Sequence, residues 1–304
     1  MLVTGGSGFL GSWVVRVARA EWSVTATYLT YRVEGNDIEW RELDARDESA
    51  VTALMEHTRP QVVIHTAALN PGRGSAFEAV NAVGTQNVAQ AASHVGARLI
   101  HLSTDVVFDG EKGSYVEEDC PSPITPYGRS KALAENAVRS VHREGIIVRT
   151  SLIYGPAADV REGSLDEIPW QRWDRQTRWV VGDLQAGRTL DLYTDEIRCP
   201  IYVESLASAL LELATADHVG QHLPGVLHVA GEQPVSRYTF GLLLARFFGV
   251  DRAGITPALS QASGRRRPLD CSLDCSRART VLCTPLPGVD QVLMPRRRRD
   301  QAQG

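Results

Sequence analysis

The chain has 304 residues, of which 43% are apolar and 22% charged, and its net charge is −4. This composition is typical of a globular protein, and the negative charge argues against binding nucleic acid or an anionic membrane. Five scattered cysteines without a Cys-x-x-Cys pair argue against a metal site or a disulfide framework. Because no run approaches the ~18 apolar residues of a membrane span and no secretion signal is visible, we expect a cytoplasmic protein.

The first feature along the chain is a short apolar strand, residues 2–4, that runs into a glycine-rich loop and then an apolar helical pattern. A Gly-x-x-Gly-x-x-Gly between a strand and a helix is the context of a dinucleotide fingerprint. The glycines permit a tight turn and close approach to a pyrophosphate, and the helix N-terminus supplies N–H groups. A purely structural loop is the alternative. The residues expected to bind the cofactor are Gly5, Ser7, Gly8, Phe9, Leu10 and Gly11.

The end of the second predicted strand, residues 23–29, bears on which cofactor is bound. A carboxylate there would bind the ribose hydroxyls of NAD, whereas this chain has Tyr28 and, close behind, Arg32. A cation without a carboxylate favours the 2′-phosphate of NADP, although Arg32 could equally be a surface arginine. Asp44 precedes a predicted helix at 48–57, where it either contacts the adenine or serves as a helix-entry residue.

Two further apolar strands end in residues suited to a ligand site. Residues 61–65 form a continuous apolar run, as in buried parallel strands, and lead to Ala67 and Ala68, whose small side chains would let a cofactor lie against the backbone. After a predicted helix at 75–95, the strand 98–102 ends in Ser103, Thr104 and Asp105. Open α/β sheets bind ligands at the carboxyl ends of their strands.

Tyr127 and Lys131 follow a polar loop and lie four residues apart on a predicted helix, so their side chains share one face. A nearby ammonium favours the phenolate and lowers the tyrosine pKa from its usual ~10, which would make Tyr127 a general acid–base. The same spacing also recurs by chance on solvated helix faces. A fifth strand is predicted at 145–150.

The alternation of strands and helices predicts an α/β fold, a Rossmann-type doubly wound parallel sheet with a smaller C-terminal substrate lobe. We assign residues 1–155, with later contributions from about 189–231, to the NAD(P)-binding domain. Residues 191–193, 203–214 and 226–230 are the elements expected to return partly to the main sheet. The substrate lobe would then comprise 156–188, which is polar and tryptophan-rich, and 232–304.

Taken together, these motifs resemble the extended short-chain dehydrogenase/reductases, and among them the dTDP-4-dehydrorhamnose reductase family. The resemblance runs through most of the chain. The matching motifs are the glycine loop 4–11, His65-Thr66-Ala67-Ala68, Asn81 with 84–87, the string 103–110, Tyr127-Gly128-Arg129-Ser130-Lys131, 148–151 with Tyr154-Gly155, Asp195-Glu196 with Pro200, 229–231, and Arg267-Pro268 with 272–274.

The resemblance implies a catalytic trio of Thr104, Tyr127 and Lys131. Hydride from NADPH, favoured here over NADH, would reduce the C4 ketone of a nucleotide-linked 4-keto-deoxysugar. Tyr127 would donate the proton and Thr104 would hydrogen-bond the same oxygen, unless Thr104 is only a strand-end cap. Lys131 would lower the tyrosine pKa and hold the nicotinamide ribose, so that Ser103, Tyr127 and Lys131 also contact the cofactor.

The substrate contacts implied by the resemblance are Thr104, Asp105, Val106, Tyr127, Leu152, Arg198 and Arg267. Two positions depart from the family pattern: Leu152 replaces a usual tryptophan, and Arg198 stands where the family has a glycine. Arg267 would grip the nucleotide diphosphate, since a guanidinium pairs with phosphate oxygens bidentately, or it belongs to a solvated basic loop.

Two other functions remain open at this stage. The chain could be a non-catalytic NADP-binding regulatory subunit of another enzyme, or a nucleotide-sugar epimerase or dehydratase, although the latter usually hold NAD tightly. A homodimer is also compatible with the resemblance.

Overall fold

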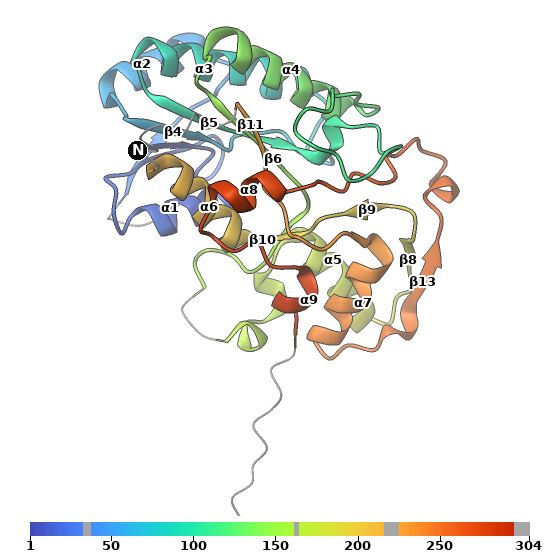
Figure 1. Cartoon of the computed structure of the whole chain (residues 1–304). Coiled ribbons are helices and arrows are strands. Elements are labelled where there is room, and N and C mark those ends of the chain that lie inside the picture. The colour runs from blue at the N-terminus through green and yellow to red at the C-terminus, as the bar shows by residue number, and fades with distance from the viewer. Residues whose placement is uncertain (33–37, 161–163, 216–224, 295–304) are drawn as a thin grey trace, which may run out of the picture.

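The computed structural model describes residues 1–32, 38–160, 164–215 and 225–294, and its centre is a seven-stranded parallel sheet (Figure 1). The strands lie in the order β11-β6-β5-β4-β1-β2-β3. Their bounds are β1 Leu2–Thr4, β2 Thr25–Tyr28, β3 Glu39–Glu42, β4 Val62–His65, β5 Arg98–Thr104, β6 Ile146–Thr150 and β11 Val226–His228. This sheet confirms the predicted α/β, Rossmann-type fold.

Helices cover both faces of the sheet. One face carries α2 (Glu48–Thr58), α3 (Gly84–His94) and α4 (Pro126–Val141), and the other carries α1 (Phe9–Ala18), α6 (Val203–Thr215) and α8 (Ser276–Val281) (Figure 1). Two apolar cores fill the spaces between sheet and helices. Burial on both faces explains why β4 and β6 read as continuous apolar runs rather than alternating ones.

The strand order changes direction at β1. The chain runs outward through β2 and β3 and then returns to β4, which pairs with the other side of β1. The carboxyl ends of β1 and β4 therefore flank a topological switch point, where open α/β sheets bind their ligands. The glycine-rich loop follows β1 at this point.

A second unit packs below the sheet around its own apolar core (Figure 1). It contains α5 (Arg175–Gln185), α7 (Arg237–Phe247), α9 (Val289–Val292), and the pair β8 (Leu190–Tyr193) and β13 (Ile255–Ala258). Two small pairs adjoin these elements, β7 (Ile153–Tyr154) with β10 (Ile201–Tyr202) and β9 (Ile197–Arg198) with β12 (Val235–Ser236). Residues 191–193 thus belong to this unit, and their assignment to the main sheet was wrong.

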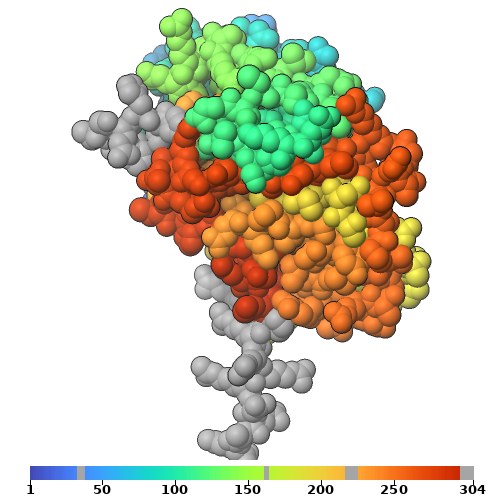
Figure 2. All heavy atoms as spheres, turned by 45° about the vertical axis from the view of Figure 1, so that its right-hand side comes forward, coloured from blue at the N-terminus to red at the C-terminus, as the bar shows by residue number. Residues whose placement is uncertain are grey.

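The two halves of the chain are joined by backbone hydrogen bonds between the loop before α4 and the C-terminal region. Tyr115 N–H donates to the Ser272 carbonyl at 2.8 Å, and Asp274 N–H donates to the Tyr115 carbonyl at 2.8 Å. Figure 2 shows this loop, in green, lying against the red and orange C-terminal segments. The loop that precedes Tyr127 is therefore anchored to the second half of the chain.

Two elements differ from the sequence-based expectation. The edge strand β3 was not predicted, because its exposed, polar sequence lacks an apolar pattern. The predicted helix at 75–95 begins as a π-helix, Glu78–Val83, that leads into α3. Short 3₁₀ helices occupy Asp105–Val107, Leu165–Glu167, Trp170–Arg172, Arg252–Gly254 and Ser260–Ser263. Within the described ranges, no helix combines the length and apolarity needed to cross a membrane.

Candidate active site

The glycine-rich loop forms a cradle that side chains would fill. Gly5 has a φ of +70°, and a Cβ there would lie 2.7 Å from the backbone nitrogen of Ala67. A Cβ at Gly11 would lie 2.2 Å from the Gly5 carbonyl oxygen. Helix α1 begins at Phe9 after Gly8, and no side chain caps its start. Its first N–H groups are thus free of side-chain caps, and this geometry fits a dinucleotide pyrophosphate.

The residues expected at the adenosine end are spread along the adjoining edge of the sheet. Tyr28 is the half-buried last residue of β2, and Arg32 is exposed. Both carboxylate oxygens of Asp44 accept from Arg46, at 2.9 and 3.0 Å from its Nε. The cap of α2 is Asp47 rather than Asp44. An adenine contact by Asp44 would compete with this ion pair.

The start of α4 is fixed by three neighbouring residues. Thr125 caps the helix by accepting from the Gly128 N–H at 3.0 Å, and Pro126 occupies the first turn. A Cβ at Gly128 would lie 2.2 Å from the Val106 carbonyl oxygen. Only glycine allows the helix to pack this closely against the 3₁₀ turn after β5, and this packing brings Tyr127 to Thr104.

Tyr127 and Thr104 lie together at the carboxyl end of β5. The pKa of the Tyr127 phenol is raised, first by burial and second by the charge of Asp105, while a hydrogen bond with the Thr104 hydroxyl acts in the lowering direction. Thr104 also caps the following 3₁₀ turn, since its Oγ1 accepts from the Val106 N–H at 3.4 Å. Tyr127 is therefore a neutral hydroxyl at neutral pH.

Lys131 lies on the same helix but its ammonium points to the sheet. Nζ donates to the Leu102 carbonyl at 2.7 Å and lies 3.4 Å from His101 Nε2. Burial lowers the pKa of Lys131 to about 8, opposed by the charge of Glu135. The expectation that Lys131 lowers the pKa of Tyr127 is thus not met in this geometry, because burial of the phenol dominates its pKa and the ammonium is bound elsewhere.

Ser103 points away from Thr104, because successive side chains of a strand face opposite sides of the sheet. Its hydroxyl donates to Glu135 at 2.6 Å, and Glu135 forms a buried ion pair with Arg149 at 2.8 Å. The Ser103 hydroxyl is thus bonded within the protein, and the contact of Ser103 with the cofactor stays a prediction.

Asn81 holds the loop after β4 against α4. Its side chain accepts from the Leu69 N–H at 2.7 Å and donates to the Leu69 carbonyl at 3.1 Å and to Ser130 Oγ at 3.0 Å. Ala67 and Ala68, half-buried in this loop, are thereby placed between the glycine cradle and the helix of Tyr127.

The Arg198 guanidinium is bonded to groups within the protein. It is 7% exposed, and its guanidinium donates to the carbonyls of Leu269 at 2.8 Å and Pro268 at 2.9 Å. Its Nε lies 3.6 Å from the Asp105 carboxylate, which also accepts from Ser151 at 2.6 Å. The predicted role of Arg198 in binding substrate conflicts with these bonds, which use its donors internally.

Next to Arg198 lie two further arginines around one buried carboxylate. Glu196 is 1% exposed and pairs with Arg267, while Arg237 Nε lies 3.6 Å from it. The Arg237 Nη1 is buried and has no hydrogen-bond partner among the described residues. No sequence pattern indicates Arg237, because a single arginine at the start of an apolar helix resembles any surface residue. Val106 and Leu152, also expected at the substrate, are half-buried.

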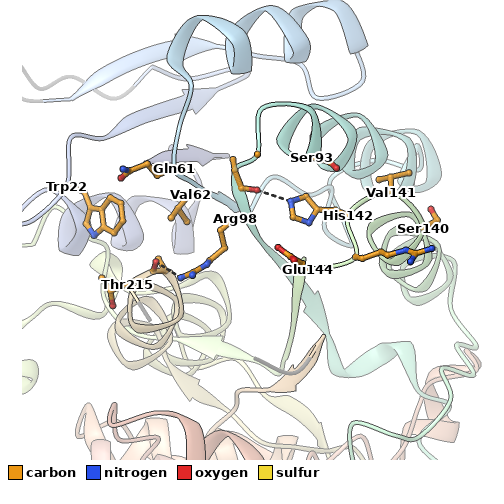
Figure 3. Close-up of a pocket in the computed structure, with 14 residues that line it drawn as sticks. Trp22, Gln61, Val62, Ser93, Arg98, Ser140, Val141, His142, Glu144 and Thr215 are labelled. Atoms are coloured by element: carbon orange, nitrogen blue, oxygen red, sulfur yellow. Dashed lines mark hydrogen bonds between the residues drawn. The ribbon is translucent and has the colours of Figure 1, made fainter. Parts of the chain in front are cut away.

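A separate cavity of about 960 Å³ lies at the opposite edge of the sheet (Figure 3). Its lining includes Arg98, which donates to the Ala214 carbonyl at 3.0 Å, and His142, which bonds to the Ala97 carbonyl at 2.8 Å. Both side chains are thus hydrogen-bonded to main-chain carbonyl groups. The cavity is remote from Tyr127, since it opens at the amino ends of β4 and β5.

Comparison with known proteins identifies the family to which this site belongs. The model of the RmlD substrate binding domain family matches residues 1–294. The chain belongs to this family. The match confirms the predicted resemblance to dTDP-4-dehydrorhamnose reductases and the extended short-chain dehydrogenase/reductase type, an oxidoreductase class that uses NAD(P).

Three relatives illustrate the range of the family. The chain is 31% identical to the probable low-salt glycan biosynthesis reductase Agl14 of Haloferax volcanii, over 96% of this chain and 95% of that protein. It is 27% identical to methionine adenosyltransferase 2 subunit beta of Rattus norvegicus, over 92% and 82%. A dTDP-4-dehydrorhamnose reductase from Bacillus anthracis, solved in complex with NADP, superposes with a TM-score of 0.77 at 25% identity, covering 96% of each chain. Relatives with bound NADP or NAD support a nicotinamide cofactor for this chain.

Proposed function

We propose that this protein is an NADPH-dependent reductase of a nucleotide-linked 4-keto-6-deoxysugar. The observation that carries the proposal is the pairing of the Thr104 and Tyr127 hydroxyls at the end of β5, beside a glycine cradle. The relative solved with NADP and named dTDP-4-dehydrorhamnose reductase supports the substrate class.

The protein's part in this reaction is to supply a proton and to orient the ketone. Tyr127 is neutral because burial raises the pKa of its phenol, so it can donate its proton to the carbonyl oxygen as that oxygen gains charge. The Thr104 hydroxyl donates to the Asp105 carboxylate at 3.1 Å in the free protein and would turn to donate a hydrogen bond to the same oxygen. When bound, the nicotinamide supplies the hydride that forms the new C–H bond. The ketone thereby becomes an alcohol.

The arginines around Glu196 suit the charged end of a nucleotide-sugar. Arg237 has a buried Nη1 without a partner among the described residues, and Arg267 keeps 35% of its side chain exposed. Guanidinium groups pair with diphosphate oxygens in a bidentate manner. We assign the diphosphate to Arg237 and Arg267 because the donors of Arg198 are already bound to carbonyls.

The preference for NADPH rests on the end of β2, where Tyr28 is followed by the exposed Arg32. A cation at this place pairs with a 2′-phosphate. The NADP complex of the Bacillus anthracis relative is consistent with this choice.

The test is nicotinamide oxidation by the purified protein with dTDP-4-keto-6-deoxyglucose, its 3,5-epimer, and the same ketosugar without the nucleotide. We expect turnover with NADPH of the nucleotide-linked sugars, with a higher kcat/KM than for NADH or the free sugar. NADPH binding without turnover of any of them would refute the substrate class. Purification with bound, oxidised NAD would instead indicate an epimerase or dehydratase.

A second candidate is a role as a binding subunit of another enzyme, favoured by the similarity to methionine adenosyltransferase 2 subunit beta. Such a role predicts that the protein binds one catalytic partner in fixed stoichiometry. Affinity capture from its own cells, followed by mass determination of the complex, would detect the partner. The same measurement on the isolated protein would reveal a homodimer.

A further inference from the structure

A row of buried polar side chains crosses the sheet beneath α3 and α4. Thr4, His65 and His101 occupy neighbouring positions on β1, β4 and β5, since each is the register partner of the next. The two histidines are 1% and 0% exposed, and their rings stack at 5.3 Å with an angle of 27° between their planes. His65 is held by Thr4 at 2.6 Å and by Thr85 at 3.0 Å, so both of its ring nitrogens are bonded.

His101 is the last residue of this row and lies next to Lys131. Its Nε2 lies 3.4 Å from Lys131 Nζ, while its Nδ1 is buried and has no partner among the described residues. A buried imidazole normally has a hydrogen bond at each nitrogen. Among the described residues, the contact with Lys131 is the one polar interaction of the His101 side chain, and the stack on His65 keeps the ring in place.

From this geometry we infer that His101 positions Lys131 by accepting one of its ammonium N–H groups, and thereby favours the charged lysine in the active site. The inference rests on the proposed reductase function. An ammonium has three N–H donors. Leu102 and His101 bind two of them at the sheet, which leaves one for the cofactor or for a hydroxyl near Tyr127.

The charges around Lys131 agree with this role. The pKa of His65 is lowered to about 3 and that of His101 well below its usual value, in both cases by burial first and by the charge of Lys131 second. Both rings are therefore neutral, and a neutral His101 can accept at Nε2 when its proton is on Nδ1. Glu135, from the same helix, is the negative charge that raises the pKa of Lys131.

The first test measures kcat/KM for ketone reduction as a function of pH in His101→Phe and His101→Gln. The quantity compared is the alkaline limb of the profile, that is, the pH at which kcat/KM falls as Lys131 loses its proton. The phenyl ring keeps the stack but cannot accept, so the limb should move down by about one pH unit. The glutamine carbonyl can accept, so its limb should lie within about 0.3 pH units of the wild type. His142→Phe is the matched control, because it also removes a buried histidine, at the far edge of the sheet. A folded His101→Phe protein with an unmoved limb would overturn the inference.

The second test needs no substrate and no His101 variant, so it separates this inference from the proposed function. Nitrogen NMR of the histidine side chains is recorded for the wild type and for Lys131→Met. We expect a neutral His101 with an unprotonated, hydrogen-bonded Nε2, whose chemical shift changes by several ppm when Lys131 is replaced, while the shifts of His142 stay constant. A His101 that titrates near pH 6.5, or a Nε2 shift unaffected by Lys131→Met, would overturn the inference even if reductase activity is found.

Discussion

The residues on the two sides of Asp105 are held in place in different ways. On the β5–α4 side, the positions of Thr104 and Tyr127 follow from the backbone, since Gly128 permits a contact that no other residue could make. On the other side, three arginines surround two carboxylates, Asp105 and Glu196. Only their arrangement in space shows that the Arg237 Nη1 has no partner among the described residues. A motif with fixed spacing can therefore locate a reacting group in the sequence. The role of an arginine, in contrast, depends on which carboxylates and carbonyls surround it in the fold.

Among substitutions of residues that only position the site, the largest effect is expected for Gly128→Ala. The added Cβ would lie 2.2 Å from the Val106 carbonyl oxygen, so α4 must move away from the turn after Thr104. A displacement of about 1 Å at a reacting group lowers kcat by about 10²-fold. Steady-state kinetics at saturating NADPH measures it. Gly225→Ala is the control, since a Cβ there meets nothing within 4 Å, and equal losses in both variants would contradict the account.

Arg198→Met should destabilise the fold. The substitution removes donors to three carbonyls, those of Ile197, Leu269 and Pro268, and leaves the buried Asp105 without its cation. We expect a loss of about 2–4 kcal/mol in the free energy of unfolding, because a buried charge loses its partner. Urea denaturation measures this loss, with Arg41→Met as an exposed control. A stable Arg198→Met protein whose only defect is a raised KM would contradict this expectation and would indicate that Arg198 binds the substrate.

Arg237→Met should instead act on the substrate. The substitution removes the Arg237 Nε contact with Glu196 at 3.6 Å, but Glu196 keeps its pair with Arg267. Because the Arg237 Nη1 has no partner among the described residues, its loss should mainly cost a bound diphosphate a charge-assisted hydrogen bond. We expect KM for the nucleotide-sugar to rise about tenfold with kcat changed by less than about twofold. Arg246→Met, at the other end of α7, is the matched control. An unchanged KM in Arg237→Met would remove Arg237 from the proposed diphosphate site.

The smallest effect concerns stability at Lys131. Its pKa is lowered from 10.5 to about 8 in the folded protein, so the unfolded chain binds more protons between these pH values. Stability of the wild type therefore rises with pH through this window, and the cost of the buried charge is fully present below it. Lys131→Met should abolish that rise and stabilise the protein at pH 7 by about 1–2 kcal/mol, although activity is lost. Thermal unfolding from pH 6 to 10 tests this, and a destabilised variant would contradict it.

Much of the fold could be predicted because its signals are local. The strand–glycine–helix beginning and the apolar runs of β4 and β6 read directly from the residues. The edge strand β3 has no such signal, because one polar strand at an exposed edge resembles a loop. The pairing of β8 with β13 joins segments more than sixty residues apart, which periodicity does not reveal.

The site residues also fall into two groups: those that the local sequence indicates, and those that only the fold brings to the site. The spacing of Tyr127 and Lys131 correctly indicates a shared helix, but not that Lys131 turns to Leu102 and His101. Ser103 is predicted at the cofactor because it ends a parallel strand, but side chains alternate along a strand, and its hydroxyl donates to Glu135 on the other side of the sheet. Arg237 could not be found from the sequence, since only the fold places it beside Glu196.

The most direct test of the central claim is NADPH oxidation with dTDP-4-keto-6-deoxyglucose or its 3,5-epimer by the Tyr127→Phe protein. The variant keeps the ring, which packs edge-on against Phe77 at 6.0 Å, and removes the proton donor. Tyr238→Phe serves as the control for loss of a phenol elsewhere. We predict a fall in kcat of about 10²–10⁴-fold. A Tyr127→Phe protein that retains wild-type turnover would show that Tyr127 is not the proton donor and would refute the mechanism.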